Sequence, residues 1–477
     1  MTIFDWRSPI RSADPSARRF VSLPLALLLV ALFSAFTIGG GARSDIVSLL
    51  LLRPIAAIVA ILALWRVSGR DVANHRAIVV MMVSAIALLA MHLVPLPAKL
   101  WQSLPDRGLV VALERLAGLE NHWRPFTLTP AEGWNALLAM LIPFAVLLAG
   151  MQTRRGDLAK VVTWLIGLGL LSAVIGLLQM LGGPGSPIYF YRHTNWGAPV
   201  GLFANANHQA VFLAALVPAL AVAGRQRGRK GQDVRSQTDW RRWLALCIGA
   251  LFITIIVLTG SRAGVLALAL GLMSIVWLRP SVGAATTSAS RWAIVAAGGA
   301  AIAALAVALR GEALLGAFSS SGSAAGRTEF WPQVWAMAQR HLPLGAGSGS
   351  FADVYQIHES AADLSPNYLN HAHNDWLEVL ATLGVPGAAL ALVGLGWTLT
   401  HGWRLHRMAA ATATSPAGDG LESVTLGRLG VVIILIFAVA SVFDYPLRTP
   451  SLSALLVVAA LFAQTPFRAT SAPARVG

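Results

Sequence analysis

The sequence has few charged residues and a single cysteine. Only 12% of its 477 residues are charged, whereas soluble globular domains carry about 25%, so this composition excludes an ordinary soluble domain. Cys247 has no second cysteine to pair with, which excludes an intrachain disulfide and a paired-cysteine metal or redox site. Apolar residues are abundant instead, at 56% of the chain with a mean hydropathy of +0.66. These values indicate a polytopic membrane protein.

The apolar residues gather in about twelve runs of roughly the length that crosses a bilayer, 17 to 25 residues. They lie near residues 20–38, 46–65, 77–94, 132–150, 158–181, 201–223, 243–258, 264–278, 292–309, 376–400, 429–443 and 450–465. This pattern predicts an all-α fold with about 12 transmembrane helices. The predicted organisation is a cytoplasmic tail (1–19), spans one to nine (20–309), one long periplasmic loop (310–375), spans ten to twelve (376–465) and a second cytoplasmic tail (466–477).

The basic residues follow this topology. A net charge of +15 would favour a nucleic-acid partner in a soluble protein. Here, with the N-terminus placed inside, 24 of the 36 Lys and Arg residues fall on the inner side and 11 on the outer side. The positive-inside rule then makes both termini cytoplasmic and residues 225–242 a short cytoplasmic loop, so no nucleic-acid partner is expected. Arg53, beside Pro54, lies within a span and has no explanation at this level.

The run at 243–278 must fold back on itself. As one helix it would measure about 54 Å at 1.5 Å per residue, and the hydrocarbon core is only about 30 Å thick. The turn signal at 259–264, Thr-Gly-Ser-Arg-Ala-Gly, therefore places Arg262 near the outer headgroups.

Two amphipathic helices and one turn are predicted on the outer side. One helix, near 97–118, lies on the membrane surface. A second one, in the long loop, has Thr328 as its N-cap and Pro332 in its first turn. The glycine-rich stretch at 345–349 is predicted to be a turn, because no strand and no βαβ unit accompany it.

Four outer positions carry candidate chemistry: Arg262, Arg327, His373 and Asp444. Each has an ordinary structural reading, since arginines anchor to headgroups, histidines begin helices and aspartates occupy turns. All four are predicted on one side of the membrane, however. Arginine suits a phosphate because its guanidinium is always charged and presents a fork of donors, and histidine accepts a hydroxyl proton near neutral pH.

The residues around these positions resemble a known family. His373–Glu378 (His-Asn-Asp-Trp-Leu-Glu) with Leu383–Gly387 (Leu-Gly-Val-Pro-Gly) is similar to the late motif of the O-antigen ligase and polymerase superfamily of bacterial envelope enzymes. Four further stretches resemble it too: Gly201–Asn207, Ser261–Gly264, Gly326-Arg327 with Trp331 and Trp335, and Pro343–Gly347. The resemblance covers about residues 190–450.

This resemblance implies a metal-independent membrane-embedded glycosyltransferase in the bacterial inner membrane. Such an enzyme needs no cofactor and moves a glycan from undecaprenyl diphosphate to a sugar hydroxyl at the periplasmic face. The acceptor is a second glycan or the lipid A core, with membrane lipids around the protein. By motif, His373 activates the acceptor, with His371 as an alternative. Arg262 and Arg327 hold the diphosphate, and Asp444 and Asn374 complete the substrate site.

Several functions are compatible with these motifs. A ligase, a chain-extending polymerase and a protein-glycosylating transferase share them, and the lack of a large domain after residue 466 favours one of the first two. The rival class is a multispan transporter or flippase of a lipid-linked glycan. That class predicts internal repeats and polar residues near mid-membrane, and no clear repeat is present.

Overall fold

The structure, a computed structural model, describes residues 21–224, 234–278, 329–360, 368–412 and 418–464. In these ranges the chain is mostly helical, and the strands found there form one short antiparallel pair, β1 (Pro95–Leu96) with β2 (Arg124–Pro125). The predicted all-α membrane fold is confirmed at this level. The expected span at 292–309, Arg327 and the Thr328 cap lie outside the described residues.

Eleven of the predicted apolar runs coincide with helices. The elements are α1 (Leu23–Ile38), α2 (Leu49–Leu64), α3 (Gly69–Asn74), α4 (Arg76–Met91), α5 (Ala98–Gln102), α6 (Gly108–Leu116), α7 (Pro130–Ala139), α8 (Leu141–Met151), α9 (Arg155–Gly182), α10 (Ala206–Ala223), α11 (Val234–Leu258), α12 (Arg262–Trp277), α15 (Trp331–His341), α16 (Phe351–His358), α17 (Asp375–Thr412), α18 (Gly418–Phe443), η1 (Pro446–Arg448) and α19 (Pro450–Ala463). In the described part of the chain, 6 helical stretches are long and apolar enough to cross a membrane. A count of 12 spans stays a prediction.

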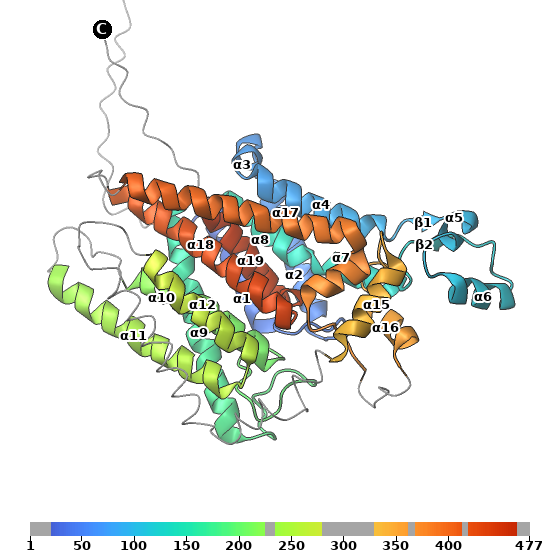
Figure 1. The fold of residues 1–477 in the computed structure, drawn as a ribbon. Coiled ribbons are helices and arrows are strands. Elements are labelled where there is room, and N and C mark those ends of the chain that lie inside the picture. Colours follow the sequence, from blue (N-terminus) through green and yellow to red (C-terminus); the bar gives the residue numbers. More distant parts are fainter. Residues whose placement is uncertain (1–20, 225–233, 279–328, 361–367, 413–417, 465–477) are drawn as a thin grey trace, which may run out of the picture.

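In the bundle α10 packs on α12 and α18, and α18 packs on α19 (Figure 1). α10 is apolar on all sides, as expected for a helix surrounded by protein, and Phe212, Leu213 and Leu216 on it are fully buried. α12 packs closely on α10 because Gly264 faces Ala210, where any side chain on residue 264 would collide. This contact fixes the starts of α10 and α12 at the same end of the bundle.

The predicted reversal between 243 and 278 occurs. α11 ends at Leu258 and α12 begins at Arg262. Gly260 adopts the left-handed conformation (φ 66°), and the Ser261 hydroxyl accepts a hydrogen bond from the Gly264 amide at 2.9 Å as the N-cap of α12. Arg262 is therefore the first residue of its helix.

α17 is interrupted at Gly384, whose φ and ψ of 61° and −154° are not helical. The break leaves the carbonyls of Ala381 and Thr382 without their helical donors, because the Val385 amide turns to the Pro343 carbonyl (2.8 Å) and Pro386 has no amide hydrogen. The amides of Ala346 and Gly347 replace them, both at 2.9 Å. The predicted turn at 345–349 is thus joined to α17 by backbone hydrogen bonds, and we call this contact the loop–helix joint.

The elements that were predicted on the outer side gather at one end of the bundle, with α5, α6 and the strand pair projecting beyond α15 and α16 (Figure 1). The helix predicted near 97–118 is divided into α5 and α6, because Pro105 interrupts the helical hydrogen-bond pattern between them. The second predicted helix is present as α15, with Pro332 in its first turn and Val334 and Met337 buried.

Candidate functional site

His373 lies at the point where the outer loop enters α17. Its φ of 50° is one of two positive values among the described non-glycine residues, and such a conformation is uncommon outside functional or tightly held positions. The next residue, Asn374, caps the helix, because its Oδ1 accepts a hydrogen bond from the Leu377 amide at 3.0 Å. The predicted catalytic residue therefore lies two residues before the start of a long helix. The side chain of Asn374 is used in capping that helix.

The structure brings Asp444 against His373. Asp444 follows the end of α18 and is completely buried, and its Oδ1 lies 3.4 Å from Nδ1 of His373. A carboxylate facing Nδ1 favours the tautomer that carries its proton there, which leaves Nε2 as a proton acceptor. The two residues are distant in the sequence, and α17 and α18 pack side by side to bring them together.

The ring of Tyr445 contacts three histidines. Its centroid lies 4.3 Å from that of His371, 4.9 Å from that of His373 and 5.1 Å from that of His208, which comes from α10. Tyr445 therefore contacts one imidazole from α10 and two from the loop that precedes α17. It was not singled out from the sequence, although it stands directly after Asp444.

Behind this group lies an ionic network on α17 and η1, in which the two carboxylates are buried. The Nε atom of Arg448 contacts Asp375 at 2.9 Å, and its Nη2 contacts Glu378 at 3.4 Å. Glu378 also accepts the Ala372 amide at 2.9 Å and pairs with Nδ1 of His371 at 3.0 Å. Burial alone would lower the pKa of Arg448, but the carboxylates of Glu378 and Asp375 raise it above its usual range, so the guanidinium stays charged. Since Glu378 holds Nδ1 of His371, this histidine has a structural partner of its own.

A cavity of about 950 Å³ opens beside this network. His371, Glu378 and Arg448 line one part of it, and apolar side chains of α4, α17, α18 and α19 line much of the rest. Arg53 also lines this cavity and donates to Oδ1 of Asn135 at 3.0 Å. The basic residue within a predicted span thus has a polar partner next to an open space.

The two predicted diphosphate-binding arginines differ in what the structure shows. Arg262 is exposed at the start of α12. It lies at the His373 end of the bundle, because its neighbour Gly264 packs on Ala210, and His208 on the same turn region of α10 reaches Tyr445. Arg327 falls outside the described residues. Three of the four outer positions therefore gather at one end.

A further group in the described part of the chain has donor atoms suited to a metal ion. Asp106, His341 and His358 each offer one ligand atom, and these atoms lie within 4.8 Å of one another. No sequence pattern points to this group, because Asp106 is far from both histidines along the chain and no short motif connects them. It comes from elements separate from the His373 site.

Comparison with known proteins bears on the middle of the chain. A search of curated proteins found no match. Residues 247–392 match a family model described as O-Antigen ligase. The matched segment includes the Arg262 turn, α15, α16, the loop–helix joint and His373, whereas Asp444, Tyr445 and Arg448 lie after it. Residues 247–392 are thus similar to the O-antigen ligase family, and this match supports the resemblance to the O-antigen ligase and polymerase superfamily.

Proposed function

We propose that this protein transfers a glycan from undecaprenyl diphosphate to a sugar hydroxyl at the periplasmic face of the inner membrane, as an O-antigen ligase or a polysaccharide polymerase. The family supports ligase or polymerase activity on lipid-linked glycan and acceptor in general. The observation that carries the finer proposal is the pairing of His373 with the buried Asp444, 3.4 Å apart at the head of a membrane helix.

In the proposed reaction the acceptor hydroxyl oxygen forms a bond to the anomeric carbon of the donor glycan. The bond between that carbon and the diphosphate oxygen breaks, and the electron pair leaves with the lipid diphosphate. The hydroxyl proton passes to Nε2 of His373, while Asp444 holds the proton on Nδ1. A base is needed more than an acid, because a sugar hydroxyl is a weak nucleophile and a diphosphate is a stable anion.

The substrates are assigned by the chemistry of the surrounding residues. Arg262 and Arg327 are proposed to bind the diphosphate, since each presents a planar fork of donors to phosphate oxygens. The cavity beside Arg448 is proposed to receive the lipid part of a substrate, because its volume falls within the range of about 300–1,000 Å³ common for ligand pockets and its walls are largely apolar. Transfer then occurs where the lipid and a periplasmic acceptor meet.

The test is a transfer assay with purified full-length protein in detergent, a lipid-linked donor and an acceptor glycan. We expect a covalent product from wild type, and a loss of transfer of about a hundredfold or more in His373→Ala, with donor binding retained. His122→Ala is the matched control, because His122 is an exposed outer-side histidine away from the site.

Two outcomes would contradict the proposal. A folded His373→Ala protein that transfers within a few-fold of wild type, with His371 intact or removed, would show that His373 is not the base. A wild-type protein that binds the lipid-linked donor and moves it across vesicles without forming product would instead favour the transporter.

A further inference from the structure

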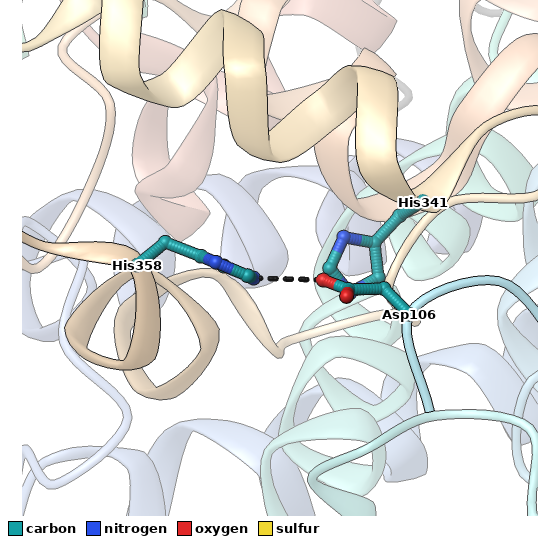
Figure 2. Close-up of side chains that lie close together, drawn as sticks. All are labelled: Asp106, His341 and His358. Carbon is teal, nitrogen blue, oxygen red and sulfur yellow. Dashed lines mark ion pairs between the residues drawn. The ribbon is translucent and has the colours of Figure 1, made fainter. Parts of the chain in front are cut away.

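Three side chains from separate segments converge outside the His373 site. Asp106 belongs to the connection between α5 and α6, His341 is the last residue of α15, and His358 is the last residue of α16 (Figure 2). Nε2 of His358 lies 3.0 Å from Oδ2 of Asp106, and Nε2 of His341 lies 3.7 Å from the same oxygen. The cluster therefore presents two imidazole nitrogens and a carboxylate oxygen to one small volume.

These separations match the coordination shell of a zinc ion. Bonds of about 2.0–2.1 Å in a tetrahedral site place neighbouring ligand atoms about 3.3 Å apart. The two measured separations, 3.0 and 3.7 Å, lie on either side of that value. The third pair, the two imidazole nitrogens, is within 4.8 Å, so a contraction of up to about 1.5 Å brings this pair to the tetrahedral separation. We propose that Asp106, His341 and His358 bind Zn²⁺, with water as the fourth ligand.

The ligands are oriented before any ion arrives. Nδ1 of His341 lies 3.0 Å from the Met337 carbonyl and donates its proton to it. This tautomer leaves the lone pair of Nε2 directed at Asp106, which is the usual arrangement of a metal-binding histidine. The side chain of His341 is only 2% exposed, so its direction is fixed by packing. Asp106 adopts a positive φ of 58°, which turns it toward the two helix ends.

Direct hydrogen bonding without an ion is the alternative, and it accounts for only part of the cluster. His358 and Asp106 at 3.0 Å are within hydrogen-bond range, but the 3.7 Å between His341 and Asp106 exceeds it. A zinc ion bound between the three side chains accounts for both the 3.0 Å and the 3.7 Å separation. Arg107 is close by, and its guanidinium donates to the Phe126 carbonyl and lies 5.6 Å from the centre of the Phe126 ring. That positive charge weakens the binding of a cation, so we expect an affinity below that of an all-cysteine zinc site.

Zinc at this position links three separate segments of the chain more tightly than their direct contacts do. It joins the connection between α5 and α6 to the ends of α15 and α16. α15 measures about 15 Å at 1.5 Å per residue, and at its other end the Trp331 indole donates to the Ala372 carbonyl at 3.2 Å, next to His373. The ion is therefore assigned a structural role, and this inference does not depend on the proposed transfer reaction.

The test uses the full-length protein in detergent with its affinity tag removed, stripped with a chelator and then titrated with Zn²⁺. We expect one zinc ion per chain by elemental analysis and a rise in melting temperature on zinc addition. His341→Ala and His358→Gln should each weaken zinc binding by more than about a hundredfold, since loss of a residue that only hydrogen-bonds to a metal ligand already costs about 10- to 100-fold. His122→Ala, which removes an exposed histidine near the same segment, should bind zinc as wild type does.

The partly exposed His358 keeps the test decisive if His341→Ala fails to fold, because glutamine retains size and hydrogen bonding there. Co²⁺ in place of zinc should give the visible absorption of a four-coordinate site in wild type and not in His358→Gln. A folded wild type that binds no zinc at neutral pH would overturn the proposal. So would zinc bound equally by wild type and His358→Gln.

Discussion

Replacing Asp444 with asparagine tests whether the tautomer of His373 matters, because the imidazole itself is retained. The substitution keeps the shape of a side chain that is completely buried, but it removes the carboxylate that faces Nδ1 at 3.4 Å. The asparagine amide can donate to Nδ1 and so favours the tautomer with its proton on Nε2, which cannot take a proton from the acceptor. The imidazole of His373 then stays in place, but its Nε2 already carries a proton and cannot act as a base.

The expected loss follows from comparable pairs. General bases contribute about 10²–10⁴-fold, and removing the aspartate behind a catalytic histidine costs up to about 10⁴-fold where it has been measured. We expect kcat to fall by about 10²–10⁴, equivalent to about 3 to 5 kcal/mol of transition-state stabilisation, with KM for the donor nearly unchanged. The observed 3.4 Å is longer than a usual hydrogen bond of about 2.7–3.2 Å, as is common before substrate tightens such a contact.

The assay measures initial rates of glycan transfer against donor concentration, together with melting temperature in detergent. Asp157→Asn is the matched control, because Asp157 pairs with Lys160 at the start of α9 and is not part of the site. If folded Asp444→Asn transfers within a few-fold of wild type while His373→Ala is inactive, His373 acts without the carboxylate and the tautomer argument is wrong.

Three further predictions concern the arginine turn, the loop–helix joint and the topology. Arg262→Ala should raise KM for the lipid-linked donor, with Arg262→Lys restoring only part of the affinity because it lacks the planar fork; unchanged donor binding in both would remove Arg262 from the site. Gly384→Ala should destabilise the protein by about 1–3 kcal/mol, since alanine is strained at a φ of 61° and meets the Pro343 carbonyl, whereas Gly396→Ala, in an open part of the same helix, should not lower the melting temperature. Reporter fusions should place residues 225–242 and 310–375 on opposite sides of the membrane, and a common side for both would refute the topology.

The helices could be predicted because hydropathy is a local property. Runs such as 201–223 and 429–443 must be buried in lipid or protein whatever their neighbours are, and their length follows from the bilayer. The turn at Gly260 was also visible, because no single helix of that length fits the membrane. The division of 97–118 was missed because its apolar spacing suggested one helix, although Pro105 stands in the middle.

The residues of the candidate site could be predicted only in part, because contacts between side chains depend on distant parts of the chain. His373 stood out through a local motif at the start of a span. Its contact with Asp444, and the pairing of Arg448 with Asp375 and Glu378, depend on how α17 and α18 pack, and no pattern within either segment records that contact. Tyr445 was overlooked because an aromatic residue after an outer turn is ordinary in a membrane protein.

The loop–helix joint has a consequence for biosynthesis. The carbonyls of Ala381 and Thr382 receive hydrogen bonds from Ala346 and Gly347, and a backbone group left unsatisfied in lipid costs several kcal/mol. The loop is translated before α17, so under the predicted topology its amides reach the far side of the membrane before the ribosome completes that span. When the part of α17 before Gly384 enters the bilayer, the amides of Ala346 and Gly347 are therefore already available to bind its two free carbonyls. The order of synthesis thus matches the order in which these hydrogen bonds are needed.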